Sequence, residues 1–164
     1  MAHAVPTSEA TPQRPPLVSS YQCLIPGRAA DVYRAAAAVP VSRLLRGGFR
    51  VVKSTAGPAG VRAGDTVDVA FGSFPVPIRF TRVAPFELAY DYLPGGISTG
   101  TNRITFEPRV TRTGEEATLV THTSIYRITN PFLRALPFVY WTAHWVAVKG
   151  MMQGVREAVR EAIR

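Results

Sequence analysis

The sequence is poor in cysteine and histidine, and these shortages exclude several kinds of site. Cys23 is its only cysteine, so the chain can form no internal disulfide and no zinc site built on thiolates. Its three histidines, at positions 3, 122 and 144, lack the spacing of a metal site. The glycine-rich residues 95–100 are followed by neither a Gly-Lys-Ser/Thr motif nor a helix, which predicts a loop between strands. We therefore expect no metal and no other cofactor.

Long hydrophobic runs are also missing. The longest apolar stretch, residues 135–148, is interrupted by Pro137 and His144 and falls short of the roughly 18–20 residues that a membrane-spanning helix needs. Residues 1–16 contain four prolines and no apolar segment typical of a secretory signal. They predict a disordered tail before a single domain over residues 17–164, and the absence of a signal predicts a cytoplasmic location.

Acidic residues are scarce, with 11 Asp and Glu against 19 Lys and Arg, which gives a net charge of +8. The basic residues are spread along the chain without a basic helix or an aromatic–basic RNA-binding pattern, so we expect no nucleic-acid partner. One loose basic group consists of Arg43, Arg46, Arg50 and Lys53. This group raises the hypothesis of a weak peripheral contact with an anionic membrane.

Short β-type segments bounded by Gly or Pro are abundant. Residues 17–25 alternate as a strand does, and they precede an Ala-rich helix over 28–39 and a short helix that ends at Gly47-Gly48. Six further strand candidates follow, at residues 49–56, 65–74, 78–84, 87–93, 101–110 and 117–128. Their regular spacing predicts an antiparallel meander.

A long amphipathic helix is expected at the C-terminal end. Asn130 and Pro131 form a helix-start signal, and the helix is predicted to run from about residue 138 to residue 163. Its apolar stripe is predicted to pass through Trp141, His144/Trp145, Val148, Met151/Met152, Val155 and Val159. Because no other element is large enough to cover one face of the sheet, we expect the helix and the sheet to enclose an internal cavity.

A family resemblance is carried by the predicted C-terminal helix and by three segments before it: AGDTVDVAFG (63–72), RVAPFELAYDY (82–92) and GEEATLVTHTSIYRI (114–128). They resemble the START/Bet v 1-like helix-grip superfamily (SRPBCC), which includes polyketide cyclases and lipid-transfer domains. The resemblance implies an α+β fold: a curved antiparallel sheet of about seven strands wraps around a long C-terminal helix, and two short helices follow the first strand. It also implies a hydrophobic or amphipathic ligand between sheet and helix.

Two functions fit this pattern. The leading hypothesis is a carrier or sensor that binds a small hydrophobic or amphipathic molecule, with ligand contacts from Phe71, Phe80, Tyr92, Phe106, Val120, Tyr126, Trp141, Trp145, Val148 and Met152. The alternative is a cofactor-independent enzyme of the polyketide cyclase or aromatase kind. In that enzyme His122, His144 and Tyr90 would transfer protons.

The strand register decides which polar side chains face the cavity, and the sequence leaves it open. His122 shares a strand face with Val120, while the opposite register would turn Leu119 and its neighbours inward. Asp91 falls on the strand face opposite Tyr90, and an inward arginine such as Arg103 would suit a carboxylate ligand. The oligomeric state is left open as well.

Overall fold

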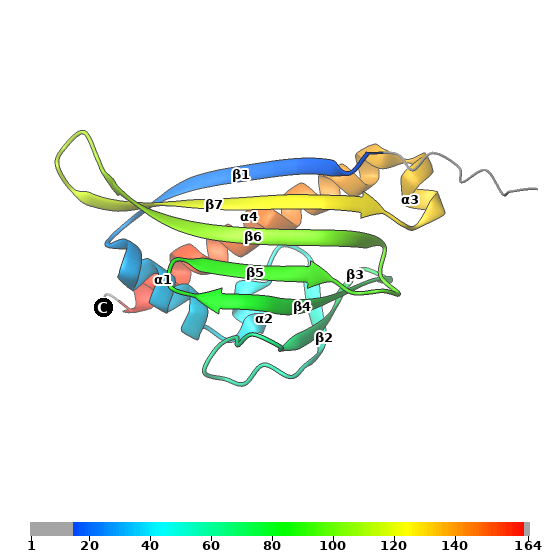
Figure 1. Cartoon of the computed structure of the whole chain (residues 1–164), viewed down its shortest axis with the longest axis horizontal. Helices are drawn as coiled ribbons and strands as arrows, with labels where there is room; N and C mark the ends of the chain where they lie inside the picture. Colours follow the sequence, from blue (N-terminus) through cyan, green and yellow to red (C-terminus); the bar gives the residue numbers. More distant parts are fainter. Residues whose placement is uncertain (1–14, 163–164) are drawn as a thin grey trace, which may run out of the picture.

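A seven-stranded antiparallel sheet covers one side of a long helix in the computed structural model, which describes residues 15–162 (Figure 1). The elements in chain order are β1 (Leu17–Pro26), α1 (Ala29–Ala38), α2 (Val41–Leu44), β2 (Phe49–Ser54), β3 (Thr66–Phe71), β4 (Phe74–Ala84), β5 (Glu87–Tyr92), β6 (Ser98–Val110), β7 (Glu116–Ile128), α3 (Pro131–Ala135) and α4 (Pro137–Ala162). The predicted helix-grip architecture is confirmed. Residues 1–14 of the predicted tail lie outside the described residues.

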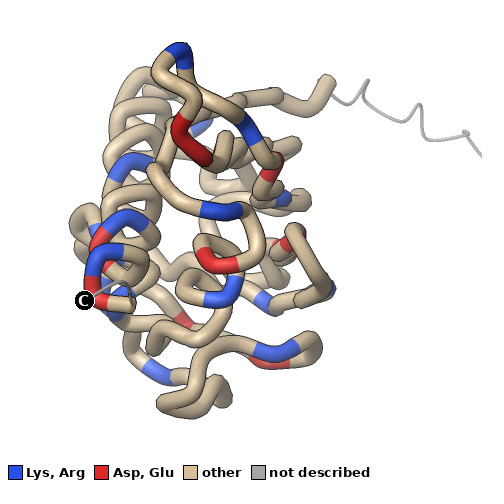
Figure 2. Tube along the Cα trace, turned by 90° about the vertical axis from the view of Figure 1, so that its left-hand side faces the viewer, with Lys and Arg blue, Asp and Glu red and all other residues tan. Residues whose placement is uncertain are grey.

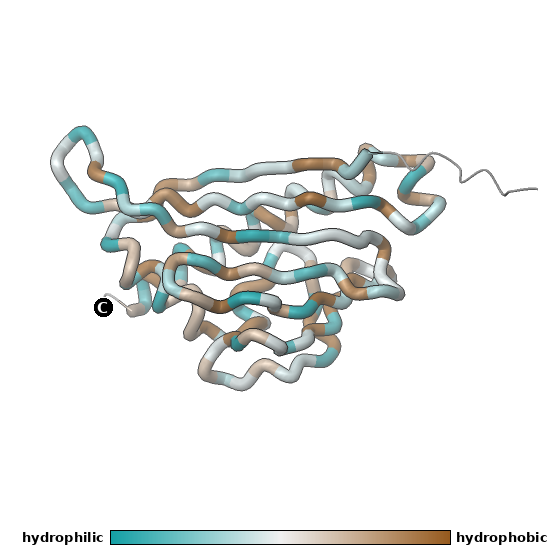
Figure 3. Tube along the Cα trace, in the orientation of Figure 1, coloured by the Kyte–Doolittle hydropathy of each residue, from teal (hydrophilic) through white to brown (hydrophobic). Residues whose placement is uncertain are grey.

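The sheet is an antiparallel meander of β2 to β7, and the first strand, β1, is added at the β7 edge. Its order is β1-β7-β6-β5-β4-β3-β2, so the first strand in the sequence pairs with the last. Apolar and polar residues alternate along several strands (Figure 3), because successive side chains point to opposite faces of a sheet. On β7 the inward set includes Val120 and His122, which are both buried. The structure therefore selects the register in which His122 faces the core.

The helix α4 lies against the inner face of the sheet (Figure 1). The short helix α3 precedes it, and the Asn130 side chain accepts a hydrogen bond from the Leu133 backbone N–H (3.1 Å), which caps α3 as the sequence predicts. The buried side of α4 runs from Tyr140 through Val148 and Met152 to Val159. Within residues 15–162, no helix combines the length and the apolar character that crossing a bilayer requires.

Glycines allow the turn between α2 and β2 to lie directly on α4. A Cβ added to Gly150 would come within 2.4 Å of the Gly47 backbone nitrogen, and one added to Gly154 within 2.5 Å of the Arg43 carbonyl oxygen. Gly47 itself has a positive φ of 85°, which favours glycine. This close backbone contact fixes the position of Leu45, Arg46 and Phe49 above the middle of the helix.

Candidate functional site

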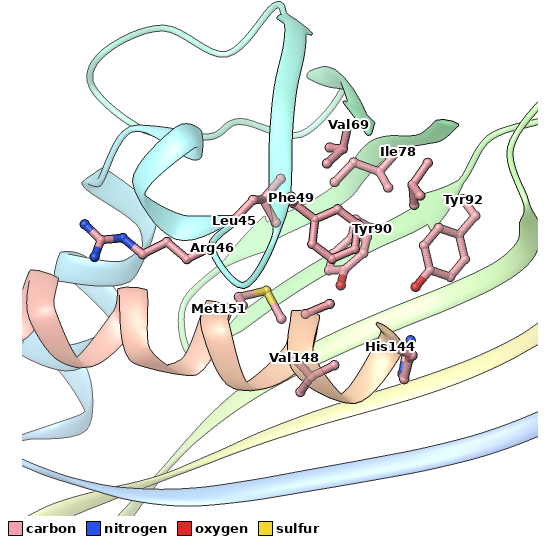
Figure 4. A pocket seen from close by; sticks show the side chains of 12 residues that line it. Leu45, Arg46, Phe49, Val69, Ile78, Tyr90, Tyr92, His144, Val148 and Met151 are labelled. Atoms are coloured by element: carbon pink, nitrogen blue, oxygen red, sulfur yellow. The ribbon is translucent and has the colours of Figure 1, made fainter. Parts of the chain in front are cut away.

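Two small cavities lie between α4 and the sheet, below the α2–β2 turn. The first, about 50 Å³, is shown in Figure 4 and is lined by Leu45, Arg46, Phe49, Val69, Val76, Ile78, Tyr90, Tyr92, His144, Ala147, Val148 and Met151. The second, about 40 Å³, is lined by Phe49, Phe71, Phe74, Val76, Ile97, Leu133, Val139, Tyr140, Ala143 and His144. Phe49, Val76 and His144 line both cavities. Side chains alone therefore separate the two spaces.

Each cavity as it stands has room for a few water molecules. A drug-sized ligand occupies a pocket of roughly 300–1,000 Å³. The interior is thus largely filled by the protein's own side chains, and a larger guest requires the wall that the cavities share to move.

Four polar side chains on the inner face of the sheet form a hydrogen-bonded chain behind the first cavity. The Tyr90 hydroxyl lies 3.0 Å from His122 Nε2, and His122 Nδ1 makes a long contact of 3.5 Å with Ser124 Oγ. Ser124 Oγ donates to Asn102 Oδ1 at 2.6 Å. Because the Ser124 proton is used in that bond, Ser124 Oγ is left to accept from His122 Nδ1–H. His122 Nε2 then accepts from the Tyr90 hydroxyl.

His144 brings a second polar group from the helix side. Its Nε2 lies 2.9 Å from Ser19 Oγ on β1. Its ring lies against those of Tyr126 and Tyr140, with centroid distances of 4.9 and 6.0 Å. The His122 ring is 6.3 Å away. Tyrosine and histidine side chains from β5, β7 and α4 therefore form one continuous cluster.

The cluster is uncharged at neutral pH. Burial, followed by the nearby His144, lowers the pKa of His122 to about 3, and burial lowers the pKa of His144 to about 4. Burial also raises the pKa of Tyr140 to about 12 and raises that of Tyr90 further. Both imidazoles are therefore neutral, and they can accept one hydrogen bond and donate another.

Three buried polar atoms in the described residues have no hydrogen-bond partner: Ser98 Oγ, Asn102 Nδ2 and the Tyr126 hydroxyl. Ser98 faces the Tyr140 hydroxyl and Asn102 faces the Tyr92 hydroxyl, but neither pair reaches full hydrogen-bonding geometry. Buried polar groups in native proteins are nearly always satisfied, so such groups require an explanation. Water or the polar group of a guest would satisfy them after small shifts of the tyrosines.

The structure brings the three predicted proton-transfer residues together. Tyr90 and His144 line the first cavity, and His122 lies directly behind Tyr90. Of the predicted ligand contacts, Tyr92 and Val148 line the first cavity and Phe71 lines the second. The others that are buried form the surrounding core and line neither cavity: Phe80, Phe106, Val120, Tyr126 and Met152.

Trp141 and Trp145 lie elsewhere than predicted. Each is 51% exposed, on the outer face of α4. The predicted stripe is correct at His144, Val148 and Met152, but in the first turns of the helix its inward positions are Tyr140 and His144. The helix is apolar on both sides there, so periodicity alone did not show which aromatic residues face the sheet.

No charged side chain enters the cluster from the strands. Arg103 points outward and pairs with Glu87 at 3.2 Å. Asp91 lies opposite Arg79 in the strand pairing, on the face away from Tyr90. Arg46 lines the mouth of the first cavity, but its guanidinium turns away from the space (Figure 4) and pairs with Glu157. Within residues 15–162, no three His, Cys, Asp or Glu side chains gather closely enough to hold a metal.

Sequence reasoning missed several residues of this site. Asn102 could have been found, because it shares the inward strand face of Ile104 and Phe106 and is a rare polar residue there. Ser19 and Tyr140 meet His144 from a distant strand and from the helix. Phe49 lines both cavities. For these three no local pattern gives a signal, because only the tertiary fold brings them to the cavity.

No protein-family model and no curated protein matches the sequence. Solved structures do match its fold. Truncated norcoclaurine synthase from Thalictrum flavum is 16% identical with a TM-score of 0.65, over 91% of this chain and 98% of the synthase. A protein of Thermus thermophilus is 19% identical with a TM-score of 0.61, over 89% of this chain and 99% of that protein. A START superfamily protein from Mycobacterium smegmatis is 12% identical with a TM-score of 0.59, over 88% of this chain and 97% of that protein. The chain therefore has the START/Bet v 1-like helix-grip fold.

Proposed function

We propose that this helix-grip domain binds a small, uncharged and mostly apolar molecule that carries a hydroxyl or carbonyl group. The observation that carries the proposal is the tyrosine–histidine cluster, which forms a polar wall in an otherwise apolar interior. In Figure 4 the Tyr90 and Tyr92 hydroxyls point toward the α4 side of the cavity, where His144 lies. Apart from Arg46, apolar side chains form the rest of the lining. Ligand pockets commonly combine an apolar lining with a few convergent polar groups.

The lack of an interior charge favours an uncharged guest. A carboxylate or an ammonium group inside would lose its hydration without gaining an opposite charge, which is costly. Arg46, the one charged side chain at the mouth of the first cavity, is already paired with Glu157. A neutral hydroxyl or carbonyl can instead exchange hydrogen bonds with Tyr92 or His144.

The size of the cavities sets the expected size of the guest. Rotation of Phe49, which is only partly buried and lines both spaces, would join them into one pocket. We therefore expect a guest of one or two fused rings, or a short chain. A long lipid would require a much larger displacement of the α2–β2 turn from its seat on Gly150.

Matched neutral and charged guests test this proposal. We expect 2-naphthol and 2-tetralone to raise the melting temperature, whereas 2-naphthoate, which has the same rings and a carboxylate, should not. A guest at 100 times its Kd stabilises a protein by about 2.7 kcal/mol, and at this chain length that corresponds to a shift of roughly 5–10 °C. Native mass spectrometry of the purified protein should show a bound neutral molecule. Equal shifts with naphthol and naphthoate, or no shift with any ring compound, would contradict the proposal.

A second candidate function is proton transfer to a bound ketone, as in a cofactor-independent cyclase. It is favoured by the chain from Tyr90 through His122 and Ser124 to Asn102. This chain orients the Tyr90 hydroxyl at the cavity wall, where the Tyr90 oxygen would accept the proton that a guest C–H loses while the Tyr90 proton shifts along its hydrogen bond toward His122 Nε2, and the reverse shift would return a proton to the guest. No metal or cofactor is needed for such a step.

Deuterium exchange at the acidic C–H of 2-tetralone, followed by NMR, tests for this activity. We expect the protein to accelerate exchange, and we expect Tyr90→Phe and His122→Phe each to lose about 10²-fold or more of the acceleration, with binding retained. His144→Phe tests the remaining predicted residue. Tyr33→Phe is the control, because Tyr33 packs against Phe86 and Phe106 and lines neither cavity. Unchanged exchange in the Tyr90 and His122 variants would remove this candidate.

The basic group at residues 43–53 gives little support to the hypothesis of a membrane contact there. Arg43 pairs with Glu161 and Arg46 pairs with Glu157. Lys53 lies opposite Asp68 in the pairing of β2 with β3. Acidic side chains within the fold therefore balance much of the positive charge of this group, and we propose no membrane contact there.

A further inference from the structure

The first half of α4 exposes large aromatic side chains on the side away from the cavities. Phe138 is 67% exposed, and Trp141 and Trp145 are each 51% exposed. Their spacing of three and four residues places them on one face of the helix. Tyr140 and His144, on the opposite face, belong to the buried cluster. We call the residues Phe138, Trp141 and Trp145 the aromatic face of α4.

Positive charge borders this face. The Lys149 ammonium group lies 4.0 Å from the centroid of the Trp145 ring, and Arg134 is exposed in the preceding helix α3. Neither Lys149 nor Arg134 forms an ion pair within residues 15–162. The sequence contains no Asp or Glu between Glu116 and Glu157.

The distribution of acidic residues separates this face from the rest of the molecule. Viewed from the end where α4 finishes, acidic and basic residues are interspersed (Figure 2). There Glu157 and Glu161 neutralise arginines of the α2 region. No such acidic partner occurs along the first half of α4.

We propose that the aromatic face of α4 docks on the surface of an anionic lipid bilayer. Tryptophan and phenylalanine partition into the interface between headgroups and acyl chains, and lysine and arginine next to them are attracted to anionic headgroups. A second copy of this chain is a poorer partner, because it would bring the same uncompensated positive charges into contact. The helix lies on the bilayer and does not cross it. This inference does not depend on guest binding.

Docking would place one wall of the second cavity close to the lipid. Val139 and Ala143 line that cavity and belong to the same helical turns as Trp141 and Phe138. Val139 is itself 36% exposed. The contact with lipid is therefore continuous with the space in which a guest would be held.

Trp141 and Trp145 are the only tryptophans of the chain, so intrinsic fluorescence reports directly on the proposed contact. We expect vesicles of phosphatidylcholine with phosphatidylglycerol to shift the emission to shorter wavelength, and brominated lipids to quench it. Pure phosphatidylcholine should act much more weakly. Salt at about 0.5 M should release most of the protein, since it shortens the range of charge interactions.

Vesicle co-sedimentation of variants completes the test. Lys149→Glu should weaken the partition coefficient about tenfold or more, and the double variant Trp141→Gln/Trp145→Gln should abolish binding. Val110→Gln, at a valine that is 71% exposed at the far end of the sheet, is the control and should bind normally. Circular dichroism and melting temperature verify that each variant folds, as expected for half-exposed positions.

Three results would overturn the proposal. The first is the absence of binding to anionic vesicles at low salt, and the second is binding that the double Trp variant retains. The third is a concentration-dependent dimer, seen by sedimentation, that the double Trp variant loses while vesicle binding is absent. In that case a second copy of the chain, and not lipid, covers this face.

Discussion

Acidification from about pH 7 to about pH 5 should remove about 4 kcal/mol of folding stability through the buried His122 and the partly buried His144. In the unfolded chain both have the ordinary pKa of 6.5, whereas in the fold burial lowers the pKa of His122 to about 3 and that of His144 to about 4. Below pH 6.5 the unfolded state therefore binds protons that the folded state does not. Acid consequently favours unfolding, and each histidine contributes about 1.4 kcal/mol per pH unit within this window.

The expected loss of folding free energy is large compared with the total stability of a domain. A loss of about 4 kcal/mol is a large share of the roughly 5–15 kcal/mol typical of a folded domain and corresponds to a fall of roughly 10 °C in melting temperature. The tyrosines in contact with the two imidazoles are Tyr90, Tyr126 and Tyr140. They stay neutral in this range, since a tyrosine has an ordinary pKa of about 10 and burial raises these pKa values further. The pH dependence of stability between pH 7 and pH 5 should therefore arise from His122 and His144.

Denaturant unfolding at a series of pH values checks this prediction. The double variant His122→Gln/His144→Gln should show a much flatter dependence between about pH 6.5 and about pH 4, whatever its stability at neutral pH. Val110→His, which adds a histidine at a position that is 71% exposed, is the control and should keep the slope of the parent. A parent slope as flat as that of the double variant would show that these histidines become charged without cost.

The fold was predictable because its signals are local. Strand lengths, the Gly and Pro breaks and the long amphipathic helix each follow from short-range patterns. The structure confirms the antiparallel meander and the C-terminal helix that these patterns predict, and the helix-grip arrangement that the family resemblance implies. The site was predictable only in part. Tyr90, His122 and His144 stood out as polar residues in apolar segments, but their mutual contact needs the register of β5, β7 and α4.

The error at Trp141 and Trp145 has a physical origin. Between Pro137 and Val148 the helix is apolar almost all the way round, and amphipathic periodicity gives a direction only where polar residues mark the outer side. In the last turns of the helix, Arg156 and Arg160 identify the outer side, and the predicted inward residues Val155 and Val159 are buried. An apolar face on each side of a helix indicates a second partner. In this chain the same segment of α4 lines the cavities on one side and forms the proposed docking surface on the other.

Filling the first cavity should abolish guest binding without unfolding the protein. Ala147 lines that cavity from α4, and Ala147→Phe would place a ring in the space between Tyr90, Tyr92 and Met151. We expect the Kd for 2-naphthol to rise about 100-fold or more, which is about 2.7 kcal/mol. Overpacking should cost about 1–3 kcal/mol of stability. The measurements are titration calorimetry and denaturant unfolding.

Two further variants on the same helix make this result specific. Thr142→Phe adds the same ring on the exposed side of α4 and should leave the Kd unchanged. Ala143→Phe fills the second cavity, so it should weaken binding strongly only for guests large enough to displace Phe49 and occupy both spaces. Ala147→Leu is a smaller filling that should give an intermediate Kd if the Phe variant folds poorly. Because all these changes lie on one rigid helix, binding that survives Ala147→Phe would place the guest outside this interior altogether.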